Sequence, residues 1–163
     1  MSFWHGIDTI LVMENGRRAR ALCNVPNTLE VFNTHFPRFP VLPGVLILES
    51  MNQLASSLLA ETGGTWHLQK ACQVRFRRFV QPGCQMEIEV EMVHLEATTA
   101  LLFGVVKVDQ RVMTTVRQLF FVSDAEGGQV QGAAPTKECV GDGQTQGAAP
   151  TEERAKEYME ENI

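Results

Sequence analysis

The chain has 163 residues, of which 44% are apolar and 20% charged, and its net charge is −5. This composition is typical of one ordinary globular domain. No apolar run approaches the roughly 18 residues that a membrane-spanning helix requires. A nucleic-acid-binding protein usually carries an excess of bases, so the negative charge argues against that class.

The N-terminus and the cysteines indicate a cytoplasmic protein. The opening residues, MSFWHGIDTILVMENG, have neither the basic start nor the uninterrupted apolar stretch of a secretory signal. The cysteines at positions 23, 72, 84 and 139 are too widely spaced for a zinc signature. We therefore expect free thiols in a reducing compartment and no structural metal.

The first predicted elements are two strands, residues 8 to 14 and 17 to 25. They flank Asn15-Gly16, a dipeptide typical of two-residue hairpin turns. A segment stiffened by Pro37, Pro40 and Pro43 follows and contains His35. This hairpin and rigid loop lead directly into the next element.

Residues 44 to 60 are predicted to form one helix, which Pro43 opens and Gly63-Gly64 ends. Apolar residues cover nearly its whole circumference, which predicts a buried helix. Glu49, Gln53 and Ser56 or Ser57 recur at helical spacing and form a narrow polar stripe. Burying an unpaired carboxylate costs several kcal/mol. Glu49 therefore either faces water or has a function.

The remainder of the domain is predicted to be strands. Residues 68 to 80 form one strand that ends before Pro82-Gly83, and QMEIEVEMV, from residue 85, alternates with period two. Residues 98 to 109 and 111 to 122 are two long strands with a tight Asp109-Gln110 connection. The expected fold is α+β: a hairpin, one central helix, then a meander of three or four strands. We expect a curved sheet and a second subunit to cover the helix.

Residues 1 to 126 are predicted to form this domain, and residues 127 to 163 a flexible acidic tail. The tail repeats QGAAPTKE as QGAAPTEE and holds seven acids and three bases, against 12 acids and 11 bases before it. A short helix that starts near Thr151 is expected to be marginal without tertiary support, because it has only about 12 residues.

His35, Glu49 and the start of the helix together suit removal of a proton next to a thioester carbonyl and β-elimination of water. The histidine can remove a proton next to the carbonyl, and the carboxyl can protonate the departing hydroxyl. Free N–H groups near Gly44 can stabilise negative charge on the carbonyl oxygen. On pattern alone, purely structural roles for His35 and Glu49 remain an alternative.

A group of bases suggests an acidic partner of modest size, although a solvated strand edge is the alternative. It consists of Arg38, Arg75, Arg77 and Arg78.

The string HFPRFPVLPGVLILESMNQ closely resembles the central motif of the 3-hydroxyacyl-[acyl-carrier-protein] dehydratases of bacterial fatty-acid synthesis, the FabA/FabZ group. That motif runs His-Phe-Pro-x-x-Pro-Val-x-Pro-Gly, then aliphatics, an acid and a Gln one turn later. VRFRRFVQPGCQMEIEVEM is similar to the strand-turn-strand that follows. The resemblance covers about residues 5 to 123. Thr34 replaces a usual Gly, and Arg38-Phe39 replaces a common Gly-His pair.

The resemblance implies a hotdog fold, in which a curved antiparallel sheet is wrapped around one long helix. It implies an obligate homodimer, often a trimer of dimers, in which the His of one subunit faces the acid of the other. His35 would be the base, Glu49 the acid, Gln53 the residue that orients Glu49, and the Gly44 amide the carbonyl-binding group.

No metal or redox cofactor is implied, and the substrate would arrive on acyl carrier protein, for which the four arginines are candidate contacts. Two other functions remain open: a hotdog acyl-thioesterase, and a non-catalytic acyl-binding subunit of a hetero-oligomer.

Overall fold

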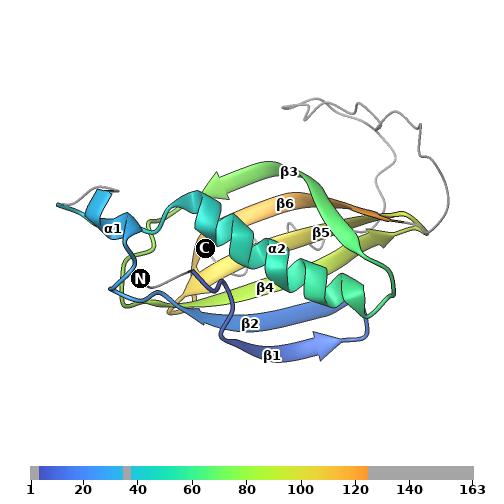
Figure 1. Cartoon of the computed structure of the whole chain (residues 1–163), viewed down its shortest axis with the longest axis horizontal. Helices are drawn as coiled ribbons and strands as arrows, with labels where there is room; N and C mark the ends of the chain where they lie inside the picture. Colours follow the sequence, from blue (N-terminus) through green and yellow to red (C-terminus); the bar gives the residue numbers. More distant parts are fainter. Residues whose placement is uncertain (1–3, 35–37, 125–163) are drawn as a thin grey trace.

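A computed structural model describes residues 4 to 34 and 38 to 124. It contains six strands and two helices, arranged as one sheet with a long helix across it (Figure 1). In chain order the elements are β1 (Thr9–Glu14), β2 (Arg18–Asn24), α1 (Val31–Thr34), α2 (Gly44–Ala60), β3 (Trp66–Phe76), β4 (Gln85–Leu95), β5 (Thr99–Val108) and β6 (Arg111–Ser123).

The sheet is antiparallel, with strand order β1-β2-β4-β5-β6-β3. The expected α+β class is confirmed, and β4, β5 and β6 form the predicted meander. Of the two expected forms, the meander has three strands and not four, because β3 pairs with β6 at the far edge of the sheet. The chain after β3 therefore crosses the sheet before β4 begins.

Both predicted tight turns are present. Asn15 and Gly16 have φ of 32° and 69°, and Asp109 and Gln110 have φ of 49° and 64°. Positive φ at both central residues is typical of the type I′ turn, whose twist matches the twist of the two paired strands. The residues of each turn therefore determine where the two hairpins form.

The predicted strand at residues 68 to 80 is shorter at its C-terminal end. The strand stops at Phe76, because the N–H groups of Arg77 and Arg78 both point to the carbonyl of Met113, at 2.8 and 3.3 Å. The chain turns away there and enters the loop that precedes β4.

Helix α2 lies across one face of the sheet and forms the core with it (Figure 1). Gly104 of β5 lies directly beneath Met51, since a Cβ at position 104 would be 3.0 Å from the Met51 sulfur. No helix in the described part of the chain is long and apolar enough to cross a membrane. Residues of α2 that are buried in the core include Ile47, Met51, Leu54, Ala55, Leu58 and Leu59.

The cysteines that the structure describes are free thiols, as predicted: Cys23 and Cys72 are buried and Cys84 is partly buried. Cys139 and the predicted tail, with its repeat and its terminal helix, lie outside the described residues.

Candidate active site

Glu49 lies on the side of α2 that faces away from the sheet. Its carboxylate accepts a hydrogen bond from Nε2 of Gln53 at 3.3 Å and a longer contact from Nδ2 of Asn52 at 3.5 Å. The predicted pairing of Glu49 with Gln53 is confirmed. In the single chain the sheet covers only one side of the helix, and Glu49 is exposed. The expected cover of this side by a second subunit stays a prediction.

The start of α2 has free backbone donors. Pro43 is the N-cap residue and makes no side-chain hydrogen bond to the helix. The first N–H groups of a helix have no partner within it, so those of Gly44 and Val45 need one from outside the helix, whereas the N–H of Leu46 donates to the Pro43 carbonyl at 3.0 Å. Gly44 is the first residue of the helix, about one and a half turns before Glu49.

Phe76 of β3 occupies the space that a side chain at Gly44 would take. A Cβ at position 44 would be 2.5 Å from the tip of the Phe76 ring. The aromatic ring therefore packs directly against the backbone at the helix start. This contact joins residues far apart in the sequence, and no local pattern marked Phe76 as part of the site.

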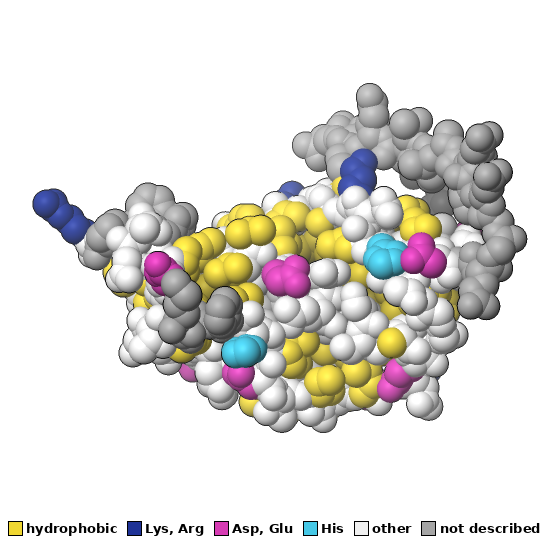
Figure 2. Space-filling model, in the orientation of Figure 1, with side chains coloured by type: hydrophobic (Ala, Val, Ile, Leu, Met, Phe, Trp, Pro, Cys, Tyr) yellow, Lys and Arg dark blue, Asp and Glu magenta, His cyan; other side chains and the backbone are white. Residues whose placement is uncertain are grey.

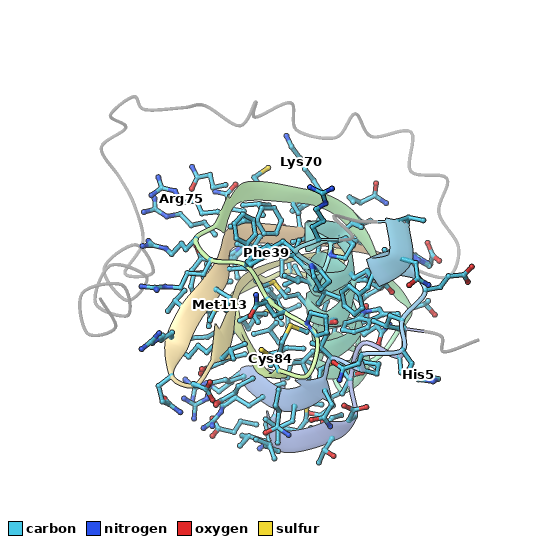
Figure 3. The ribbon with its side chains drawn as sticks, turned by 90° about the vertical axis from the view of Figure 1, so that its left-hand side faces the viewer. His5, Phe39, Lys70, Arg75, Cys84 and Met113 are labelled. Carbon is cyan, nitrogen blue, oxygen red and sulfur yellow. The ribbon has the colours of Figure 1, made fainter. Side chains whose placement is uncertain are left out.

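The loop before α2 and the loop after β3 lie side by side. The rings of Phe39 and Phe79 meet edge to face, with centroids 6.2 Å apart, and the N–H of Leu42 donates to the Val80 carbonyl at 2.7 Å. Figure 3 views the molecule from this end and shows Phe39 above Met113.

The pairing of these loops places Arg38, which is next to Phe39, on the same end of the molecule as Arg77 and Arg78. All three are exposed, as is Arg75. Arg75 points away from the ribbon (Figure 3). Three of the four bases that the sequence singled out, Arg38, Arg77 and Arg78, therefore lie in one region beside the start of α2, whereas Arg75 pairs with Thr115 within the sheet.

His35 lies outside the described residues, between Thr34 at the end of α1 and Arg38. Among residues 4 to 34 and 38 to 124, no group of three or more His, Cys, Asp or Glu side chains could hold a metal ion.

Exposed apolar side chains surround the start of α2. Val45 is 69% exposed and lies one turn before Glu49, and Phe79 is 73% exposed. Phe39 and Phe76 are also among the exposed large apolar residues. Figure 2, which looks at the α2 face, shows hydrophobic side chains gathered over its left half, around the start of α2 and along β3. A patch of this kind commonly marks an interaction surface.

Gly6 is a site residue that the sequence interpretation missed. It has φ of 74°, and a Cβ there would be 2.4 Å from Oε1 of Gln53. The preceding segment is held on α2 as well, since Nε1 of Trp4 donates to the Leu46 carbonyl at 3.2 Å. Gly6 therefore leaves the space in which Gln53 can point at Glu49.

Replacing Gly6 with alanine is expected to displace Gln53 and lower kcat by about tenfold, the effect of a disturbed positioning group. The matched control is Gly63→Ala. Gly63 has φ of 89°, and nothing lies within 4 Å of its added Cβ. Both variants share the cost of a non-glycine residue at positive φ, which is about 1–3 kcal/mol. Steady-state kinetics with equal losses in both variants would show that Gln53 has no positioning role.

Comparison with known proteins gives the family. The model of the ApeI-like dehydratases (ApeI dehydratase) matches residues 12–119. The 3-hydroxyacyl-[acyl-carrier-protein] dehydratase FabZ of Bacillus subtilis is 35% identical over 122 residues, covering 72% of this chain and 86% of that protein. FabZ of Pectobacterium atrosepticum is 41% identical over 113 residues, covering 65% of this chain and 74% of that protein.

Solved structures agree on the fold. The dehydratase heterocomplex ApeI:P of Xenorhabdus doucetiae superimposes with a TM-score of 0.55 at 24% identity, covering 69% of this chain and 96% of that chain. A hypothetical thioesterase from Streptococcus pneumoniae, solved with coenzyme A, superimposes with a TM-score of 0.59 at 14% identity. The match covers 71% of this chain and 84% of that chain. Structural similarity at such low sequence identity shows that these proteins share the hotdog fold. With the family match over residues 12–119 and the FabZ relatives, the chain belongs to the ApeI-like dehydratases, a family of hotdog-fold hydro-lyases.

Proposed function

We propose that this dehydratase removes water from a 3-hydroxyacyl thioester carried on acyl carrier protein and forms the trans-2-enoyl thioester, in fatty-acid or related acyl-chain synthesis. The observation that carries the proposal is the Glu49 carboxylate, which Gln53 holds on the open side of α2, about one and a half turns beyond an uncapped helix start. The FabZ relatives are named for this reaction, which supports the choice of substrate.

In the proposed mechanism His35 removes a proton from the carbon next to the thioester carbonyl. Negative charge then builds up on the carbonyl oxygen, and the amide at Gly44 donates a hydrogen bond to it. Glu49 in its protonated form gives a proton to the 3-hydroxyl, which departs as water. Gln53 fixes the direction of the Glu49 carboxyl during this transfer. No metal or redox cofactor takes part in these steps.

The two competing functions predict different products. A thioesterase would use Glu49 to direct water at the carbonyl and would release a free thiol. A non-catalytic acyl-binding subunit would bind the acyl group without changing it. The His-Phe-Pro motif at residues 35 to 37 favours the dehydratase, since a thioesterase does not need its histidine base.

The reaction itself tests the proposal. The purified full chain is incubated with the four-carbon trans-2-enoyl thioester on acyl carrier protein, and hydration is followed by the loss of enoyl absorbance while a thiol reagent follows thioester cleavage. We expect hydration without thiol release. Thiol release would indicate a thioesterase, and no change in either signal would indicate an acyl-binding subunit.

We further propose that a second copy of the chain covers the open side of α2 and places its His35 opposite Glu49. The support is chemical: Glu49 and the 69%-exposed Val45 share a helix face that the chain's own sheet leaves bare. A second copy would exclude water from the carboxyl, and exclusion of water strengthens the electrostatic interactions of a site.

Val45→Asp is expected to convert the dimer to a monomer, because it adds a charge to the centre of that interface. The control is Leu11→Asp, which changes an exposed apolar residue of β1 at the opposite edge of the sheet. Light scattering coupled to gel filtration measures the molar mass of both variants and of the wild type. A wild-type chain that is monomeric at micromolar concentration would reject the dimer, and so would an unchanged mass for Val45→Asp.

The bases near the start of α2 are proposed to contact the acidic carrier protein. Reversing Arg38 and Arg78 to Glu is expected to raise KM for the carrier-bound substrate by about tenfold or more, because rim charges steer association. KM for the same acyl group on pantetheine should be unchanged. The control is Arg17→Glu, at the other end of α2 from the proposed contact. Gly16, the residue before Arg17, lies beside Thr62, which follows the C-terminal end of that helix. Equal KM changes for both substrates would place the arginines in the acyl site instead.

A further inference from the structure

The face of the sheet opposite α2, here called the outer face, carries unusual apolar residues on β5. Gly104 faces Met51 of α2, so its neighbours Phe103 and Val105 point the other way. An antiparallel sheet with one face in water normally carries polar residues on that face. Strand β5 is apolar on both faces instead.

These outer residues are nevertheless buried. Phe103 is 8% exposed and Val105 is 1% exposed, although neither belongs to the core cluster that packs around α2. Both helices of the described chain lie elsewhere, α2 across the inner face and α1 at one end (Figure 1). Cys72 of β3 shares the outer face, since its neighbour Ala71 pairs with the core residue Leu119, and it is buried too. The outer face is therefore built to be covered.

Bases border this apolar patch on the side of β3 and β6. Lys70 pairs with Phe120, whose β5 partner is Leu101, and Arg75 pairs with Thr115, whose β5 partner is Val105. Directly opposite residues of an antiparallel pair share a face. The β3 and β6 side of the apolar strip thus carries positive charge that suits an acidic, partly apolar segment. The β4 side carries Glu89 and Glu91, the partners of Val105 and Phe103, and Glu89 lies 3.8 Å from Arg18.

The last residues of the chain have this character. In residues 151 to 163, Ala155, Tyr158, Met159 and Ile163 fall at helical spacing on one side. The same segment holds five glutamates against Arg154 and Lys156. A helix of about 12 residues is marginal in water and needs a surface to pack on.

The length of the intervening chain permits the contact. Strand β6 ends at Ser123, at the margin of the outer face. Residues 125 to 150 are rich in Gly, Pro and Gln, and a flexible chain of that length spans roughly 25–30 Å on average. The middle of β5 is about seven residues of strand away, or roughly 23 Å.

We propose that residues 151 to 163 dock as an amphipathic helix on the outer face of their own sheet, with Tyr158 and Met159 against Phe103 and Val105. This interaction covers the apolar side of β5 within one chain. It is independent of the dehydratase reaction, whose groups lie on and around α2.

The test is the rate at which Cys72 is alkylated in the full chain, measured peptide by peptide with mass spectrometry. Tyr158→Glu is expected to raise this rate by about 10- to 100-fold, since it removes one large apolar side chain from the contact. Glu157→Gln is the matched control, on the opposite side of the predicted helix, and should leave the rate unchanged. Cys23 is the negative control for unfolding of the core, because burial and the nearby Asp8 raise the pKa of its thiol to about 12 and keep it unreactive in the folded chain.

Two results would overturn the proposal. One is a rate of Cys72 alkylation that is the same in Tyr158→Glu as in the wild type. The other is protection of Cys72 that strengthens as protein concentration rises, which would mean that a second copy covers the outer face.

Discussion

Replacing Glu49 with glutamine is expected to lower kcat for dehydration by about 10²- to 10⁴-fold, the usual contribution of a positioned general acid. The amide keeps the shape of the carboxyl and can still contact Gln53, but it cannot transfer a proton. Because Glu49 is exposed in the single chain, we expect the free energy of unfolding of each subunit to change by less than about 0.5 kcal/mol. Stopped assays with carrier-bound substrate and urea unfolding measure the two quantities.

The control for this variant is Glu61→Gln. Glu61 is an exposed carboxylate at the C-cap of the same helix, at the end far from the site. His35→Ala should cause a loss of the same order, and the double variant should lose little more, because groups that act as a unit are not additive. Activity that survives both single substitutions would reject the proposed pair.

Leu54→Ala is expected to cost about 2–5 kcal/mol of the free energy of unfolding, the largest stability effect that we predict. Leu54 is fully buried where α2 packs on the sheet. Removal of its side chain leaves a cavity that the rigid sheet cannot fill. Urea unfolding, followed by far-UV circular dichroism at two protein concentrations, separates loss of the fold from loss of an oligomer.

The matched control is Ser56→Ala, on the partly exposed side of the same helix, with an expected change below about 0.5 kcal/mol. If both variants lost similar stability, the core would not lie between α2 and the sheet.

The two hairpin turns and the long helix could be predicted from sequence because their signals are local. Asn15-Gly16 and Asp109-Gln110 adopt the positive φ values that two-residue turns require. Helix α2 spans the predicted residues, Gly44–Ala60, because Pro43 and Gly63-Gly64 limit it chemically at each end.

The position of β3 could not be predicted in this way. Periodicity shows that a segment is a strand and which residues share a face, but it says nothing about which strand is its neighbour. Strand β3 joins β6 at the sheet edge through pairs such as Phe76 with Thr114, which are distant in sequence. Its early end at Phe76 likewise depends on the Met113 carbonyl of another strand.

The sequence by itself determined the α+β class, the polar stripe of α2 and the pairing of Glu49 with Gln53, because residues four apart on a helix are neighbours whatever surrounds them. Only the tertiary structure decided that Glu49 is open to solvent in a single chain, that Phe76 packs on Gly44 and that Gly6 leaves room for Gln53. Burial and close approach depend on what the rest of the chain places against a residue, and a local pattern does not contain that information.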